Sequence, residues 1–221
     1  MKRFLFLLLL PVALCVFAQN DSIEKKTLHD YFVKNKMYID DYSKAGAKWN
    51  QALKAINGYP ELPFNQEGKV EYVFVEDFTS IDKNQLFSRA LEYLSLTYGL
   101  IPAYLYSNPA DGKIICTQSF DLSANSKYTF SYIITVKNDK LMIEFLNIDY
   151  ETKSGGFYSG DVWIPESKTT THIDQIFPII LKKQSEWGSY LTLIRQMDDH
   201  FRDEVLNLRT YVLNYQLRYT F

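Results

Sequence analysis

Hydrophobic and polar positions divide the chain into short strands and amphipathic helices. Residues 69–78 (KVEYVFVEDF) carry β-branched and aromatic side chains on both faces, which predicts a central strand covered on one side and partly on the other. Residues 128–136 alternate in polarity, which predicts a strand with one strongly apolar face. Asn138 and Asp139 suit a two-residue turn because both tolerate a positive φ, so residues 141–150 should pair back as the next strand.

The helix after the first strand has the clearest end signals. Asp82 is a suitable N-cap, and Gln85 follows three residues later, which is the arrangement of a capping box. Ile81 and Leu86 are placed to form a hydrophobic staple across the same end. The apolar stripe that follows stops at a glycine, so one amphipathic helix is predicted between Asp82 and Gly99.

Further segments complete the predicted order of elements. A turn at residues 109–112 leads into a strand at 113–117, and residues 157–164 predict a fifth, shorter strand at an edge of the sheet. Residues 169–171 begin the passage to a C-terminal helix. Because short turns join consecutive strands, the order β-α-β-β-β-(β)-α predicts an α+β fold, with an antiparallel sheet of about five strands and helices on one face.

Residues 19–63 predict a polar lead followed by one short N-terminal helix. Tyr42, Ala45 and Trp49 recur at helical spacing, and this helix should end near Asn57. Two prolines shortly afterwards mark a linker into the main domain.

A long helix is predicted over residues 184–218, roughly 50 Å at 1.5 Å per residue. Its first half can close the sheet, whereas its second half, from about Phe201, must bury its apolar stripe elsewhere. It can pack on the N-terminal helix around Trp49, which keeps the chain monomeric, or on a second copy or a partner helix. Irregular heptad spacing and aromatic stripe residues favour packing within the chain, and so a monomer slightly over a homodimer. The stripe consists of Trp187, Tyr190, Ile194, Met197, Phe201, Val205, Leu208, Val212 and Tyr215.

Four segments carry a resemblance to a known family: GKVEYVFVEDF (68–78), NQLFSRALEYL (84–94), DGKIICTQSF (111–120) and YTFSYIITVKNDKLMIEF (128–145). They resemble a family of unknown function with a TATA-binding-protein-like (TBP-like) fold, common in exported proteins of Bacteroidota. The resemblance implies a curved antiparallel sheet backed by helices, and it carries no known activity and no binding residues. The predicted domains are a signal peptide at 1–18, the lead and short helix at 19–63, a TBP-like α+β domain at 64–182, and a long C-terminal helix at 183–221 packing on that domain.

The N-terminus has the three parts of a signal peptide. Basic residues at 2–3 precede an apolar run at 4–14, which is shorter than the about 20 residues that span a bilayer as a helix. Compact residues up to Ala18 then form a cleavage site. We therefore expect an exported, periplasmic or cell-surface protein that begins at Gln19 and has no integral membrane span. Lipidation at Cys15 is less favoured, because a small residue is expected just before such a cysteine and a leucine stands there.

Composition limits the classes of function. The chain is 47% apolar and 23% charged, which excludes a disordered protein. Its 24 basic and 26 acidic residues argue against nucleic acid or an anionic membrane as partner, because no excess of positive charge exists to recruit one. Cleavage after Ala18 would leave Cys116 as the one cysteine, which we interpret as a small apolar residue in a strand rather than a nucleophile.

No motif for catalysis or metal binding is recognisable in the sequence. The histidines stand far apart, at His29, His172 and His200. Residues 198–200 (DDH) predict a solvated helix face, because neighbours on a helix point about 100° apart. Residues 76–77 (ED) are interpreted as a polar strand end rather than a catalytic pair. The sequence therefore predicts no catalytic, cofactor-binding or metal-ligating residue, and no cofactor.

Three functions remain open at this stage. The export signal, the missing motif and the long helix favour a non-catalytic envelope protein that binds another protein or assembles with itself. The alternative is a carrier of a small apolar or glycan ligand in a groove between the sheet and the helices, supported by the 17 Tyr and 15 Phe residues. The third is a hydrolase without a recognisable motif.

Overall fold

The structure is a computed structural model that describes residues 29–30, 32–34, 39–59, 62–79, 81–99, 105–159 and 162–215. The predicted signal peptide at 1–18, with its cleavage site at Ala18 and the alternative lipidation site at Cys15, lies outside the described residues. The chain divides into two compact units, which are described separately. The first unit comprises Met1–Glu61 and Gln175–Asp198, and the second comprises Leu62–Asp174 and Asp199–Phe221.

The first unit is helical. It contains α2 (Ile39–Ala55), the short 3₁₀ helix η3 (Ile179–Leu181) and the beginning of α4 (Trp187–Leu213). The rings of Trp49 and Trp187 are both buried and meet edge to face, with centroids 5.2 Å apart. Asn57 follows α2 with a positive φ of 57°, which confirms the predicted end of this helix.

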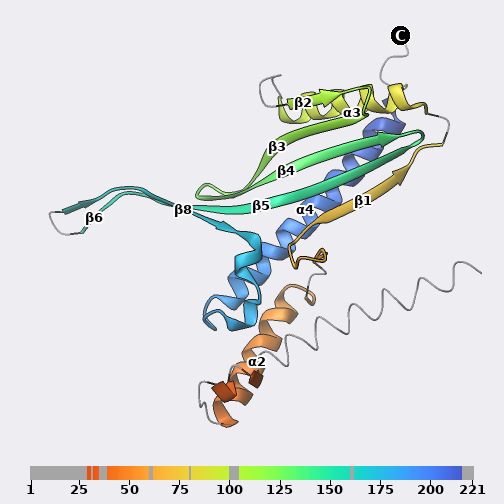
Figure 1. Ribbon diagram of the computed structural model, residues 1–221. Coiled ribbons are helices and arrows are strands. Elements are labelled where there is room, and N and C mark those ends of the chain that lie inside the picture. Colours follow the sequence, from red (N-terminus) through yellow and green to blue (C-terminus); the bar gives the residue numbers. More distant parts are fainter. Residues whose placement is uncertain are drawn as a thin grey trace, which may run out of the picture. The chain divides into compact units, whose positions relative to one another are not determined.

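The second unit is built on a curved antiparallel sheet (Figure 1). The strand order is β1-β5-β4-β3-β2, and β8 pairs with the far part of β5. The strands β6 and β7 form a separate two-stranded hairpin. The strands are β1 (Tyr72–Asp77), β2 (Leu105–Asn108), β3 (Lys113–Ser123), β4 (Ser126–Lys137), β5 (Lys140–Ser154), β6 (Phe157–Ser159), β7 (Val162–Ile164) and β8 (Ser167–His172).

Local signals in the sequence are reproduced at both predicted ends of α3 (Lys83–Tyr98). The Asp82 carboxylate accepts hydrogen bonds from the backbone N–H groups of Asn84 and Gln85, and so caps the N-terminus. Gly99 ends the helix in the left-handed conformation, with φ 58°. The prediction of this helix and of its caps is confirmed.

The central hairpin is also confirmed. β4 and β5 pair from Lys137↔Lys140 onward, and Asn138 takes the positive φ, 52°, that the turn requires. Together with the helices on one face of the sheet, this pairing confirms the predicted class: α+β, with a curved antiparallel sheet backed by helices.

Other predicted strands are corrected by the pairing. β1 is an edge strand and not a central one, since it pairs only with β5 among the described strands. Residues 157–164 form the β6–β7 hairpin rather than one edge strand. Residues 169–171 lie within β8, and β2 was not predicted at all. The error on β1 has a physical cause, because its partner β5 lies far away in the sequence and leaves no local signal.

The two halves of α4 contact each other's predicted partners. Trp187, in its first part, lies against Trp49 of α2. Phe201, in its second part, lies on the sheet against Phe145 and Phe130, at ring-centroid distances of 4.5 and 4.9 Å. The prediction that the first half closes the sheet is therefore wrong. Most of the apolar stripe is buried, whereas Tyr190 and Tyr215 are half-buried, and the preference for a monomer stays a prediction.

Candidate functional site

Alternation along β1 places its side chains on two different faces of the sheet. Tyr72 is buried on the face covered by α4, where its ring lies 4.9 Å from that of Phe201. Val73 and Val75 point to the other face, and 50% and 57% of their surfaces are exposed. Single exposed apolar residues are common on protein surfaces, whereas two exposed valines side by side on one face of a strand form a small apolar patch.

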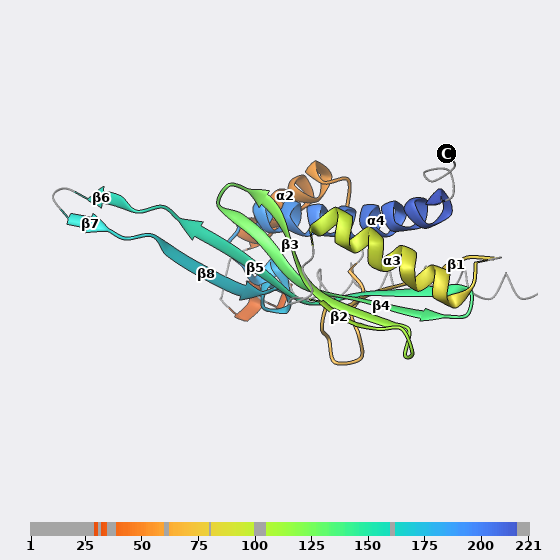
Figure 2. The ribbon, with the colours of Figure 1, turned by 90° about the horizontal axis from the view of Figure 1, so that it is seen from above.

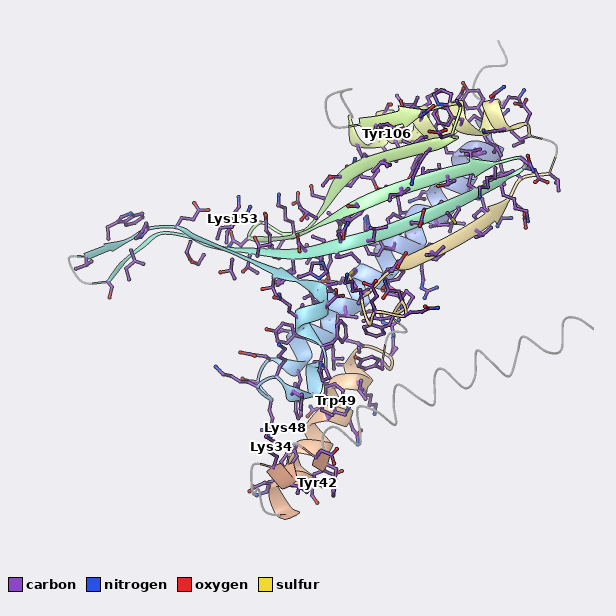
Figure 3. The ribbon with its side chains drawn as sticks, in the orientation of Figure 1. Lys34, Tyr42, Lys48, Trp49, Tyr106 and Lys153 are labelled. Carbon is purple, nitrogen blue, oxygen red and sulfur yellow. The ribbon has the colours of Figure 1, made fainter. Side chains whose placement is uncertain are left out.

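The exposed face of the sheet, which we call the open face, carries apolar side chains on all five strands, with polar side chains among them. Antiparallel pairing aligns one row of side chains across this face. The row runs from Val73 on β1 to Tyr106 on β2 (Figure 3), through Glu144, Ile133 and Ile115. Glu144 stands within the row, between Ile133 and Val73, and it forms no ion pair among the described residues. The apolar side chains of the open face are Val73, Val75, Tyr106, Ile115, Ile133, Met142 and Leu146, and the same face carries Glu144, Lys113, Thr117, Ser131 and Thr135.

A second exposed feature is the arm, which we define as the far part of β5, β8 and the β6–β7 hairpin. It projects well beyond the rest of the sheet of its own unit (Figures 1 and 2). β5 and β8 pair without a break from Asp149↔His172 to Ser154↔Ser167. The buried carboxylate of Glu151 binds the ammonium groups of Lys127 and Lys168, and so ties β5 to β4 and to β8.

Three apolar side chains are exposed on β7, near the tip of the arm. Val162, Trp163 and Ile164 on β7 are each more than one third exposed, and the exposed fraction of Trp163 is 52%. The Trp163 ring lies over the backbone of Gly156, where an added Cβ would come within 2.3 Å of the ring. Because glycine has no side chain, the indole can pack directly on the backbone at Gly156. The other surface of the indole stays accessible to solvent.

A buried cluster around Glu204 holds the most perturbed ionisable groups of the second unit. Burial raises the pKa of the Glu204 carboxyl, although hydrogen bonding from Tyr98 and Tyr93 opposes the rise. Burial also raises the pKa values of the phenols of Tyr93, Tyr98 and Tyr132, and the neighbouring Glu204 charge adds to this effect. These side chains come from α4, α3 and β4.

This cluster is a closed part of the core rather than an accessible reaction site. Glu204 is 4% exposed, Tyr132 is fully buried, and Cys116 next to them is buried as well. Glu204 Oε1 has no hydrogen-bond partner among the described residues. A carboxyl in such surroundings favours the protonated form, in which it can donate a hydrogen bond. We therefore interpret Glu204 as a buried polar group in the contact between helix and sheet, and not as a catalytic residue.

Cys116 lies where the sequence placed it, buried in a strand. Its thiol is free and lies 3.8 Å from the carbonyl oxygen of Tyr132. Burial raises the pKa of this thiol, which keeps it protonated and poorly nucleophilic.

The histidines are not brought together among the described residues. His172 pairs with Asp174 at 3.0 Å, and the His200 ring stacks on Phe120 with centroids 3.8 Å apart. The prediction of a solvated face at residues 198–200 is wrong, because Asp198 is 3% exposed and His200 is half-buried. Burial lowers the pKa of His200. Within the described ranges, no cluster of three or more His, Cys, Asp or Glu side chains could hold a metal ion.

The two acids at the end of β1 are structural. Glu76 accepts a hydrogen bond from the Arg209 guanidinium of α4 at 2.7 Å, and Asp77 pairs with Lys140 of β5 at 2.6 Å. Each carboxylate has its own cation, which agrees with a polar strand end and not with a paired acid and base.

A groove of about 670 Å³ runs along α3. Phe87 and Leu91 of α3 and Pro109 of the β2–β3 turn form its apolar walls, and Glu92 lies at its rim. This groove is distinct from the space between sheet and helices, which buried aromatic side chains such as Phe145 fill. In the part of the chain that the structure describes, no helix is long and apolar enough to cross a membrane.

These features define an α+β protein with an open sheet face and a projecting arm. The chain is similar to a TBP-like protein from Parabacteroides distasonis ATCC 8503, at 17% identity and a TM-score of 0.49, over 69% of this chain and 97% of that chain. It is also similar to a DUF4468 family protein from Bacteroides ovatus ATCC 8483, at 12% identity and a TM-score of 0.48, over 68% of this chain and 90% of that chain. No family model and no curated protein matches the sequence. At TM-scores below 0.5 these similarities assign no activity and no residue role to this chain.

Proposed function

We propose that the chain is an exported, non-catalytic binding module that uses its open face to bind another protein of the cell envelope. The observation that carries the proposal is the exposure of Val73 and Val75 on an edge strand, in register with further apolar residues across the sheet. Exposed apolar side chains of this kind gain free energy when a partner removes them from water.

The open face also limits what the partner can be. Glu144 lies inside the apolar row, so a partner that covers the row must supply a cation opposite this carboxylate or leave it buried without a counter-charge. Two copies that met through this row around a two-fold axis would bring two Glu144 carboxylates close together. We therefore favour an unlike protein with an apolar surface and a lysine or arginine over self-assembly.

Native extracts of the cell envelope test the proposal. We expect the wild-type chain to elute from size-exclusion chromatography in a complex larger than one chain, and the double variant Val73→Glu, Val75→Glu to elute at the mass of one chain. Leu206→Glu, at an exposed leucine of α4, is the matched control and should elute with the wild type. Elution of the wild type as a single chain at its native concentration would contradict the proposal.

The α3 groove supports a second candidate, a carrier of a small apolar ligand. Its volume of about 670 Å³ lies within the range of about 300–1,000 Å³ that ligand sites occupy. Lauric acid is a suitable probe, and its binding should raise the melting temperature of the wild type. Leu91→Trp, which fills the groove, should abolish this rise, whereas Leu96→Trp on the exposed side of α3 should preserve it.

A further inference from the structure

The geometry of the arm points to a second contact surface: we propose that the β6–β7 tip docks on a lipid bilayer and inserts Trp163, Val162 and Ile164 among the headgroups. The tip is the part of the arm that projects farthest from its sheet (Figures 1 and 2). It can therefore reach a flat surface before the rest of its unit does. This contact is separate from the open face and does not depend on it.

The size of the tip favours a bilayer over a folded protein. Each strand of the tip has three residues, so each is about 10 Å long. A stable interface between two proteins buries about 800 Å² on each partner, which is more than so short a hairpin offers. Insertion into a bilayer needs no minimum area, because each apolar side chain contributes separately.

The residue types suit the boundary between headgroups and acyl chains. Indole rings prefer this region, because one end of the ring is apolar and its N–H can remain hydrated. Backbone pairing from Phe157↔Ile164 to Ser159↔Val162 already satisfies part of the peptide groups that insertion would remove from water.

One lysine can limit the depth of insertion. Lys153 lies next to the Ser154↔Ser167 pair at the end of the β5–β8 ladder (Figure 3), whereas the ammonium group of Lys168 opposite it is bound by Glu151. The long side chain of Lys153 can keep its ammonium group at the level of the phosphates while the tip enters the bilayer. The formal net charge of the chain is −2, so attraction to anionic lipid is not the driving force. Docking should therefore occur on zwitterionic vesicles and change little with salt.

Tryptophan fluorescence provides a specific reporter. The chain has three tryptophans, of which Trp49 and Trp187 are 3% and 2% exposed, whereas Trp163 is 52% exposed. Contact with lipid should therefore change the emission of Trp163 and leave that of the other two unchanged.

The test uses the mature chain, purified from its native cells, and vesicles of phosphatidylcholine. We expect the chain to float with the vesicles, its emission to shift to shorter wavelength, and brominated lipid to quench the shifted emission. The double variant Val162→Ser, Ile164→Ser keeps Trp163 and should bind the vesicles at least about tenfold more weakly. The control Leu96→Ser, at an exposed leucine of α3 outside the arm, should bind like the wild type. Circular dichroism should show that all variants are folded.

Absence of flotation together with unchanged emission would overturn the proposal. Equal binding by the tip variant and the wild type would overturn it too, because another surface would then hold the lipid. Binding that disappears at high salt would contradict the apolar mechanism.

Discussion

Phe145 and Phe201 stack nearly parallel, with ring centroids 4.5 Å apart and 13° between their planes. The pair joins the middle of β5 to the second part of α4, and Tyr72 and Phe130 each meet Phe201 at 4.9 Å. All four side chains are buried. This aromatic group holds the second part of α4 on one face of the sheet, and among the described residues of this unit no helix lies on the opposite face (Figure 2).

Phe201→Ala should destabilise the second unit strongly. Removing a buried phenylalanine ring costs about 3–5 kcal/mol, because the contacts are lost and a cavity remains. Urea unfolding followed by circular dichroism measures the change. Leu206→Ala, on the exposed side of the same helix, should change the free energy of unfolding by less than about 0.5 kcal/mol. Similar losses for both variants would show that Phe201 is not central to the core.

Glu204→Gln should stabilise the protein at neutral pH. Burial raises the pKa of Glu204 in the folded state, so its contribution to stability is fully present below the unfolded pKa and is lost as pH rises through the folded value. The amide cannot ionise and avoids this loss. The advantage of the variant in free energy of unfolding should therefore grow as pH rises above about 4.3, to about 1–3 kcal/mol.

The control for this effect is Asp199→Asn, at an exposed carboxyl on the same helix. Urea unfolding at a series of pH values should give parallel curves for this variant and the wild type. Parallel curves for Glu204→Gln as well would contradict the assignment of a raised pKa to Glu204.

Cys116 should be unreactive in the folded protein. Its thiol is buried and burial raises its pKa, so labelling by a thiol reagent should require unfolding. Cys116→Ser should retain the fold and lose about 1–2 kcal/mol, because a hydroxyl is harder to bury than a thiol. Rapid labelling of the native protein would show that the strand opens there or that the thiol is accessible.

Much of the local structure and the β4–β5 hairpin could be predicted from the sequence, whereas the place of β1 at the edge of the sheet could not. The caps of α3 depend on Asp82 and Gly99, which act within a few residues of the helix ends. Position in the sheet is different: the two-sided apolar pattern of residues 69–78 is typical of a central strand, yet β1 is an edge strand with two exposed valines. The two valines of the open face are thus visible in the sequence, but their pattern is typical of a central strand that is partly covered on this face as well.

The reversed packing of α4 has a similar origin. Its apolar stripe has the same spacing in both halves, so periodicity cannot tell which half contacts the sheet and which contacts α2. The buried Glu204 cluster was not predicted either, because a glutamate and three tyrosines on different elements form no motif in sequence. Only the fold brings Glu204 near Tyr98 and Tyr132.

Export is tested by the N-terminus of the mature protein. We expect mass spectrometry of the protein from its native envelope to find a chain that begins at Gln19, because the sequence up to Ala18 matches the pattern that signal peptidase cleaves. A chain that begins at a lipid-modified Cys15 would contradict this cleavage and would show a membrane-anchored protein.

The central claim is that the open face binds another protein, and site-specific photo-crosslinking in living cells tests it most directly. A photoreactive amino acid at Val75 should yield one discrete adduct with a different protein, whereas the same group at Leu206 should yield none. An adduct at twice the mass of the chain would show self-assembly instead of an unlike partner. No adduct at Val75, or the same adducts at both positions, would contradict the claim.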